Sequence, residues 1–261
     1  VPIALADITI TKDQSTYNIG NRIKASASVV YDHDFEGLFK LTLSCDTYRL
    51  QYFLTPISLE SKFVTAINVP DLTITASMLG KCTIIASLST NDDLLVESKE
   101  SGPFEVTDQI TILPTKNSIV ALPGEKIQIA GIVNEGFGNN ILKASIKIKL
   151  DENSYITEAI DGKFSFDLEL PKTIKSGNNA IEITASDAKG NTGSSSIELA
   201  ITPVPSYIKT ELSAESINPG QRIDIMSSLY DQADDLINVS LELELVAPSG
   251  SKVFNKIADS N

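Results

Sequence analysis

The stretch YNIGNRIKA at residues 17–25 returns in similar form as LPGEKIQI at 122–129 and as NPGQRIDI at 218–225. Each copy is a turn with a glycine, then two polar residues, then a strand in which apolar and polar residues alternate. The three glycines lie 104 and 96 residues apart (20 to 124, 124 to 220). This period is the length of one β-sandwich, so the sequence predicts two sandwiches and the beginning of a third.

Residues 125–201 show the clearest strand pattern. Between 142 and 150 apolar residues alternate strictly with lysine and serine, which predicts a strand with one buried face. Asp161-Gly162 is a preferred two-residue turn between paired strands, and alternation returns over 164–170, 181–185 and 197–201. About seven strands with turns between them are typical of an immunoglobulin-like sandwich. The predicted fold class is therefore all-β: tandem immunoglobulin-like β-sandwiches, the third one incomplete.

The same residues resemble a known group of modules. GKF at 162–164 leads to Leu168 and Leu170, and GNNAI at 177–181 precedes ASDAKGN at 185–191. This run is similar to the second half of immunoglobulin-like modules in prokaryotic (bacterial or archaeal) surface or secreted proteins. The resemblance covers 108–203 and implies the fold but no single function, since such modules serve as spacers, adhesin stalks and enzyme appendages.

In the third unit, SINPG at 216–220, IDI at 223–225 and the leucines at 241, 243 and 245 are similar to the opening strands of macroglobulin-type modules. The repeats divide the chain into 1–107, 108–203 and 204–261, the last being the first half of a sandwich. Only residues 106–109 join the first two units, and TPVP at 202–205 joins the second to the third. Short linkers and linkers with proline restrict hinge motion, so we expect a rod.

The first unit has a less regular pattern than the second. We expect its strands at 23–30, 38–45, 48–54, 63–69, 83–89 and 104–106.

The charge balance narrows the classes of partner. Lys and Arg number 21 and Asp and Glu 34, a net charge of −13 that is spread along the chain. Nucleic acid and anionic membranes favour basic patches, so neither is an expected partner. No apolar run approaches the roughly 20 residues of a membrane-spanning helix, and VPIALA at 1–6 lacks the basic start of a signal peptide. We expect a protein or cell-surface glycan as partner, with self-assembly as an alternative.

The two cysteines both lie in the first unit. Cys45 shares a strand face with Leu41 and Leu43, and Cys82 shares one with Ile84 and Ala86. Both thiols are therefore expected to point at the core from strands that the fold brings together. A disulfide between them is the preferred prediction, and two buried unpaired thiols are the alternative.

No residue set suits catalysis or a cofactor. His33, the only histidine, lies between Asp32 and Asp34, a weak candidate for a metal site that is better explained as a solvated loop. With one histidine, a Ser-His-Asp or Cys-His site is not expected.

Other acidic loops, and one glycosylation triplet, carry weaker signals. Calcium is a weak alternative at Asp187 with Asn191 and at Asp231, Asp234 and Asp235, because neither group has the spacing of a calcium loop. Asn238-Val239-Ser240 is a weak acceptor for N-glycosylation.

Three hypotheses of different classes follow. The preferred one is a non-catalytic extracellular rod of tandem immunoglobulin-like domains on a cell surface, with a structural or adhesive role. The second is a subunit of an extracellular filament or sheath assembled by strand complementation, in which residues 3–10 would be the donated strand. The third is an accessory region, carbohydrate-binding or spacer, of a secreted hydrolase, for which Tyr48, Tyr52 and Phe53 are the nearest to an aromatic platform.

Overall fold

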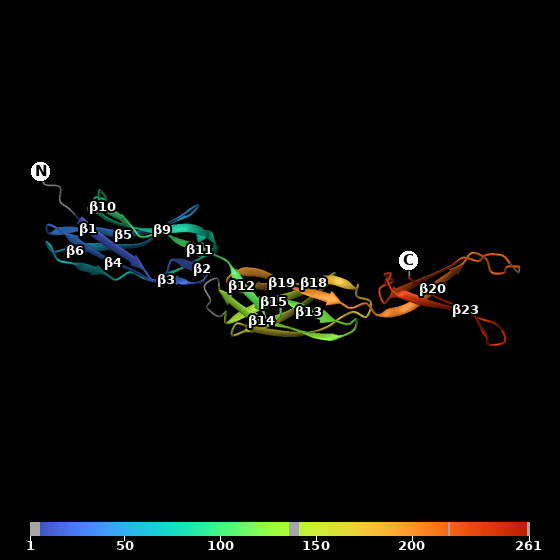
Figure 1. Ribbon diagram of the computed structural model, residues 1–261. Helices are drawn as coiled ribbons and strands as arrows, with labels where there is room; N and C mark the ends of the chain where they lie inside the picture. The colour runs from blue at the N-terminus through green and yellow to red at the C-terminus, as the bar shows by residue number, and fades with distance from the viewer. Residues whose placement is uncertain (1–5, 136–140, 219, 260–261) are drawn as a thin grey trace.

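The computed structural model describes residues 6–135, 141–218 and 220–259 and shows three units in a row (Figure 1). Strands make up nearly all of the regular structure, and η1 (Ala76–Met78) is a single 3-10 turn. No helix in the described part is long and apolar enough to cross a membrane. The molecule is therefore an elongated series of β-sheet units.

Unit 1 consists of two main sheets that enclose one core. The first sheet has the order β1-β4-β7, and its strands are Ala6–Lys12, Ala25–Tyr31 and Thr65–Ile67. The second has the order β2-β11-β9-β5-β6, with strands Thr16–Asn18, Phe104–Thr107, Gly80–Ser89, Phe35–Cys45 and Arg49–Leu59. Two short strands, β3 (Arg22–Ile23) and β8 (Leu72–Thr73), pair with each other, and β10 (Leu95–Glu100) pairs with β9.

The expected strands of unit 1 are present with shifted ends, but two pairings were not expected. Residues 6–12 form β1 and pair with β4, and residues 95–100 form β10. The side chains of β10 are largely exposed, so its sequence, LVESKE, does not alternate between apolar and polar residues. Alternation therefore could not predict this strand.

Unit 2 is a complete sandwich whose strands follow the order β12-β14-β17-β16-β15-β18-β19-β13. Their bounds are Ile110–Pro114, Lys126–Glu135, Lys163–Glu169, Asn153–Ile160, Lys143–Leu150, Gly177–Ser186, Thr192–Ile201 and Ser118–Ala121. The tight turn at Asp161 and Gly162 has φ of 50° and 74° and joins β16 to β17. These left-handed values suit the Asp-Gly pair that the sequence placed there.

Unit 3 contains two hairpins. β20 (Pro205–Leu212) pairs with β21 (Ile225–Asp231), and β22 (Ser240–Val246) pairs with β23 (Lys252–Asp259). Units 1 and 2 each have a core cluster of fully buried apolar side chains. Among the described residues of 204–259, Leu229 is the one buried apolar side chain. The sheets thus show two complete immunoglobulin-like sandwiches and an incomplete third.

The three repeated phrases form the same hydrogen-bonded turn. In the first copy the Asn21 N–H donates to the Asn18 carbonyl (3.0 Å), while the Asn18 N–H donates to Oδ1 of Asn21 (2.7 Å). The same two bonds join Leu122 to Glu125 and Asn218 to Gln221. Their glycines, Gly20, Gly124 and Gly220, have φ of 84°, 76° and 86°, which other residues adopt only with strain. Each phrase therefore encodes a four-residue turn, and the side chain of the fourth turn residue (Asn21, Glu125 or Gln221) accepts the N–H of the first.

Candidate functional site

The described residues contain no group of three acidic, cysteine or histidine side chains arranged to hold a metal. The most elaborate polar arrangements lie at the two joints between the units.

The linker between units 1 and 2 is held on both sides. The Asp108 carbonyl accepts a hydrogen bond from the Thr192 N–H of β19 (2.7 Å), and Gln109 pairs with the same threonine. The Gln109 carbonyl accepts a bond from Nδ2 of Asn18 (2.7 Å), whose Oδ1 accepts one from the Thr107 hydroxyl (2.9 Å). Peptide groups that are bonded to both neighbouring units cannot rotate freely, so this linker is not a hinge.

A preformed loop of unit 2 contacts the first copy of the repeated turn. Asn191 is fully buried, and its Nδ2 donates to the Ile19 carbonyl of unit 1 (3.1 Å) and to Oδ2 of Asp187 (2.8 Å). Oδ1 of Asp187 accepts the backbone N–H groups of Lys189, Gly190 and Asn191 at 2.9–3.0 Å. The loop is thereby fixed within unit 2, so little ordering accompanies its contact with unit 1.

A carboxylate in the same joint connects three elements. Glu135 lies at the end of β14, and its side chain is 12% exposed. Its Oε2 accepts a bond from Nδ2 of Asn21 (3.1 Å), and its Oε1 lies 3.3 Å from Nζ of Lys189. A buried carboxylate is costly without such partners. A Cβ at Gly20 would lie 2.3 Å from Cδ of Lys189, so a side chain at this position of the turn would collide with unit 2.

The joint between units 2 and 3 uses different residues. Asp231 is 1% exposed, and Ser176 of unit 2 donates its hydroxyl to Oδ2 of that aspartate. Nε2 of Gln232 donates to the Ile174 carbonyl (2.8 Å) and to the Ser176 hydroxyl (2.9 Å), and its Oε1 accepts the Val204 N–H (2.9 Å). Both sides of this second joint are therefore bonded as well.

The pKa of Asp231 reflects this position. Burial acts to raise the pKa, but the bonds from the Ser176 hydroxyl and from the backbone N–H groups of Asp235 and Ala233 favour the ionised form. The net result is a pKa below the ordinary value, so the carboxylate at this joint is charged at neutral pH.

The acidic loops considered for calcium have a common turn geometry. In each, the first residue's N–H donates to the fifth residue's carbonyl, over Asp187–Asn191 (3.1 Å) and Asp231–Asp235 (2.9 Å). Thr90 and Leu94 at the β9–β10 hairpin form the same bond (2.9 Å). Asp187 and Asp231 each accept N–H groups of their own loop through Oδ1. These hydrogen bonds explain why an aspartate occupies the first position of each loop.

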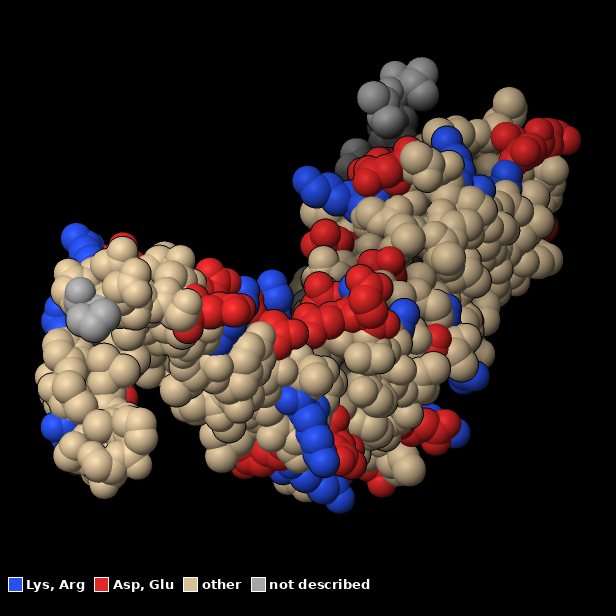
Figure 2. Space-filling model, turned by 90° about the vertical axis from the view of Figure 1, so that its right-hand side faces the viewer, with Lys and Arg blue, Asp and Glu red and all other residues tan. Residues whose placement is uncertain are grey.

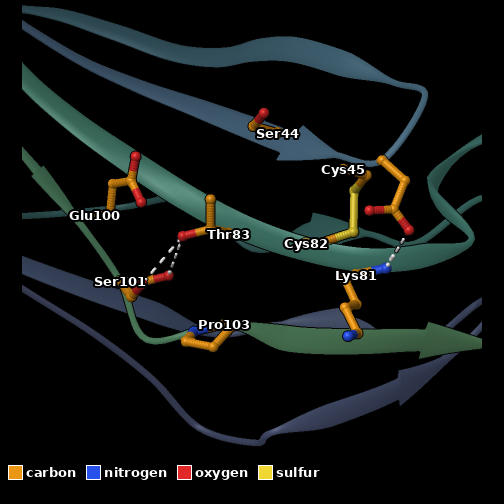
Figure 3. Close-up of a pocket in the computed structure, with 9 residues that line it drawn as sticks. Ser44, Cys45, Lys81, Cys82, Thr83, Glu100, Ser101 and Pro103 are labelled. Atoms are coloured by element: carbon orange, nitrogen blue, oxygen red, sulfur yellow. Dashed lines mark hydrogen bonds between the residues drawn. A yellow bond between two sulfur atoms is a disulfide. The ribbon is translucent and has the colours of Figure 1, made fainter.

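The two cysteines face each other on neighbouring strands of one sheet (Figure 3). Cys45 ends β5 and pairs in register with Cys82 of β9, and their Sγ atoms form a disulfide bond. Cys82 is buried as the sequence predicts, while Cys45 is only half-buried.

A pocket of about 390 Å³ adjoins the disulfide, and Lys81, Glu100 and Ser101 are among its lining residues. The Thr83 hydroxyl donates to the Ser101 carbonyl (3.0 Å), and both residues are labelled in Figure 3. The Lys81 N–H donates to Oδ2 of Asp46 (3.0 Å). The lining groups contain no imidazole to activate a nucleophile.

The remaining predicted residues lie apart from the joints. Asp32, His33 and Asp34 are exposed between β4 and β5, and Oδ1 of Asp34 accepts the Ser61 N–H (2.8 Å). Asn238 is exposed before β22.

The aromatic residues considered for glycan binding are half-buried. Tyr48, Tyr52 and Phe53 pack against the core of unit 1, and burial raises the pKa of Tyr52. Part of each ring is therefore taken up by contacts with the core, and glycan binding stays a prediction.

Sequence reasoning missed most of the joint residues. Asn18 and Asn21 were visible only as parts of the repeated turn, and Glu135, Ser176 and Gln232 carried no pattern. The one available signal was the polar residue that directly follows each turn glycine.

No family model matches the chain, and no curated protein matches its sequence. Among solved structures, the chain aligns over 98% of its length with a tetra-tandem repeat from the extending region of a large adhesion protein, at 16% identity and a TM-score of 0.40. It spans 63% of that structure, which is less than two thirds of its length.

Two further solved structures are similar over most of the chain. A structure of a 1.5-MDa bacterial ice-binding adhesin aligns with 98% of the chain, at 10% identity, a TM-score of 0.31 and 96% coverage of that structure. Two immunoglobulin domains of titin in tandem align with 76%, at 11% identity, a TM-score of 0.28 and 97% coverage. The strands and sheets of the chain itself show the fold: all-β, with tandem immunoglobulin-like units.

Proposed function

We propose that this chain is part of a non-catalytic extracellular rod on a cell surface, with a structural or adhesive role. The observation that carries the proposal is the linker at Asp108 and Gln109, whose carbonyls are bonded to both neighbouring units. A spacer needs joints that transmit orientation, and a linker fixed in this way does so.

The design of both joints supports the same role. Each joint combines a loop that its own aspartate holds in shape with a buried polar contact to the preceding unit. Such contacts are directional, because a tilt of the units would break the bond from buried Asn191 to Ile19 or the bond from Ser176 to buried Asp231. Hydrogen bonds across the joints, together with the short linkers, therefore limit the motion of one unit relative to the next.

The surface and the disulfide support an extracellular setting. Disulfides persist in oxidising compartments, and Cys45 and Cys82 are bonded. On the face shown in Figure 2, acidic and basic side chains are interspersed among wide neutral areas, which suits solubility. Prokaryotic origin, the macroglobulin resemblance and the partner stay predictions.

Scattering and distance measurements test the rod. X-ray scattering of the whole chain should show an elongated particle, and spin labels on units 1 and 2 should give one narrow distance distribution. Asn191→Ala with Glu135→Ala should broaden that distribution by removing the buried contacts of the joint. Asn91→Ala with Glu60→Ala, at exposed positions of unit 1, is the matched control. A compact particle, or a broad distribution in the unaltered chain, would show that the proposal is wrong.

Assembly by strand complementation is a second candidate function. It stays a prediction from the sequence. The donor strand that the sequence suggested, residues 3–10, is corrected in its described part: residues 6–10 belong to β1, and Ile8 and Ile10 are buried in the core of unit 1. A donor would therefore have to be a different strand.

A further inference from the structure

A long strand edge lies open within unit 2, in the middle of the chain. β16 pairs with β15 along its whole length, but it pairs with β17 only at Ile160 and Lys163, next to the Asp161-Gly162 turn. On the core side, the rings of Tyr155 and Phe166 lie 5.5 Å apart between the two strands. Among the described residues, none forms backbone hydrogen bonds with the other side of residues 153–159.

The turn determines which backbone groups point to this open side. Ile160 and Lys163 flank a two-residue turn, so their backbone groups face each other across it. Backbone groups of successive strand residues point to opposite sides, and the Asp161 N–H accordingly points away, to the Leu142 carbonyl (2.9 Å). Three residues therefore direct their N–H and C=O groups to the open side: Ser154, Ile156 and Glu158.

The open edge of β16 lacks the features by which other edges of the two sandwiches resist pairing. Proline and charged side chains discourage the addition of a strand. The edge strand β6 of unit 1 contains Pro56, and β17 has carboxylates at Asp167 and Glu169. Between residues 154 and 158 β16 has neither proline nor lysine, and its outward Ile156 is 73% exposed.

This edge is complementary to itself in a two-fold antiparallel arrangement. When Ile156 lies opposite Ile156 of a second copy, Ser154 of each copy lies opposite Glu158 of the other. Each of these pairs then exchanges two backbone hydrogen bonds, so every open group of the three residues has a partner. The two exposed isoleucines cover each other, and each glutamate faces a serine instead of a like charge.

The neighbouring registers are less favourable. Centring the pair on Tyr155 places Glu158 opposite Glu152, and centring it on Glu158 places that residue opposite itself. Like charges directly opposite each other destabilise a sheet. Centring on Thr157 places Ile156 opposite Glu158, so the isoleucines no longer cover each other. A register centred between two residues would set outward side chains opposite inward ones.

The lysines of the neighbouring strand do not prevent this pairing. Lys147 lies beside Ile156 on β15, so the two copies of Lys147 would be three strand spacings apart, about 14 Å. This separation exceeds the Debye length of about 8 Å at physiological salt. Glu158 also keeps a cation in its own chain, since Lys143 lies 3.0 Å from it.

β16 runs along the length of the molecule. The antiparallel strand β18 begins just after Ser176, which contacts unit 3, and ends just before the loop at 187–191, which contacts unit 1. β15 and β16 lie beside β18 in the same sheet, within the row of units that Figure 1 shows. Antiparallel pairing of β16 therefore places two rods side by side and pointing in opposite directions.

We propose that the open edge of β16 pairs with the same edge of a second copy of this chain, in the antiparallel register centred on Ile156. The two copies point in opposite directions, as rods from two facing surfaces would. The pairing thus supplies an adhesive contact for the rod. That role rests on the proposed function, whereas the pairing itself rests on β16 alone.

Self-association of the whole chain tests the pairing. Sedimentation should show a dimer that dissociates on dilution, and hydrogen exchange of residues 154–158 should slow as the dimer forms. Ile156→Lys sets two ammonium groups opposite each other and should weaken association at least about tenfold. Val120→Lys makes the same change in charge at an apolar residue of β13 that is 75% exposed, and it should leave association unchanged.

Opposite charges at residue 156 test the register. Ile156→Lys and Ile156→Glu should each be monomeric alone, while an equal mixture of the two variants should form a heterodimer. The register centred on residue 156 places the substituted lysine opposite the substituted glutamate, which restores a favourable pair. Slow exchange of the β15 amides in both variants would show that each remains folded.

Four outcomes would overturn the proposal: a chain that stays monomeric up to about 1 mM, a dimer that persists in Ile156→Lys, an equal loss in Val120→Lys, or a mixture without heterodimers. The test is also distinct from that of the rod. An elongated monomer would refute the pairing and leave the rod intact. A compact particle that still dimerises through β16 would refute the rod alone.

Discussion

Units 2 and 3 begin alike and end differently. Both contain a capped glycine turn that follows an early strand and leads into another strand, β14 in unit 2 and β21 in unit 3. In unit 2 the strands close around fully buried Ile129, Ile146 and Ile148. In unit 3 the two hairpins leave inward side chains of the same kind exposed, such as Phe254 at 46% and its pairing partner Leu245 at 48%.

The difference shows that the alternating pattern specifies strands but not their burial. Alternation makes one face of each strand apolar. The stabilising free energy of apolar burial is gained only when another sheet covers that face. Unit 1 adds a third case, a complete core that also has a covalent cross-link. The following predictions test this contrast among the units, from the largest effect to the smallest.

Removal of the disulfide should have the largest effect, and it should be confined to unit 1. The bond joins residues 37 apart in sequence, and Cys45→Ser with Cys82→Ser should lower the free energy of unfolding of unit 1 by about 4 kcal/mol. Denaturant unfolding followed by hydrogen exchange checks this. Identical peptide maps with and without reductant would show that the bond is absent in solution.

A core truncation should separate units 2 and 3. Ile146→Ala removes a fully buried side chain and should cost unit 2 about 3 kcal/mol. Leu243→Ala, at the corresponding inward position of β22, should cost under about 1 kcal/mol because that side chain is only half-buried. Equal losses in the two units, measured by exchange of the strand amides, would contradict the view that unit 3 is open.

The turn glycines offer a matched pair of substitutions. Gly20→Ala and Gly220→Ala both place a Cβ at a φ near 85°, so they share the same backbone strain. A Cβ at Gly20 also meets Lys189 across the joint, whereas a Cβ at Gly220 has nothing within 4 Å.

The first substitution should therefore cost about 1–2 kcal/mol more than the second. It should also widen the distance distribution between units 1 and 2. An equal cost with an unchanged distribution would mean that the turn is not a contact site of the joint.

Acid should loosen the joint between units 2 and 3. The pKa of Asp231 is lowered in the folded chain, so the ionised carboxylate stabilises the joint above its ordinary pKa of 3.8. This contribution is lost as pH falls through the lower pKa of the folded state, when the carboxyl takes up a proton.

Distances between labels on units 2 and 3 should broaden below about pH 4. Asp231→Asn cannot be ionised and should lack this transition, which distinguishes Asp231 from the other carboxylates. A transition of the same size in that variant would assign it elsewhere.

Much of the fold could be predicted, because it depends on local pattern. The strands of unit 2 and the turn at Asp161-Gly162 follow from alternation and from the φ values that glycine permits. β10 could not be predicted in the same way, since its exposed side chains leave no alternation to detect. The capping role of Asn21 was hidden too, because any polar residue fits that pattern.

By itself, the sequence determined the class of fold, the repeat of the glycine turn and the acidic character of the chain, all of which are encoded in neighbouring residues. Only the tertiary structure decided the joints. Asn18 and Gln109 are 91 positions apart and Ile19 and Asn191 are 172 apart, and no local pattern links such pairs.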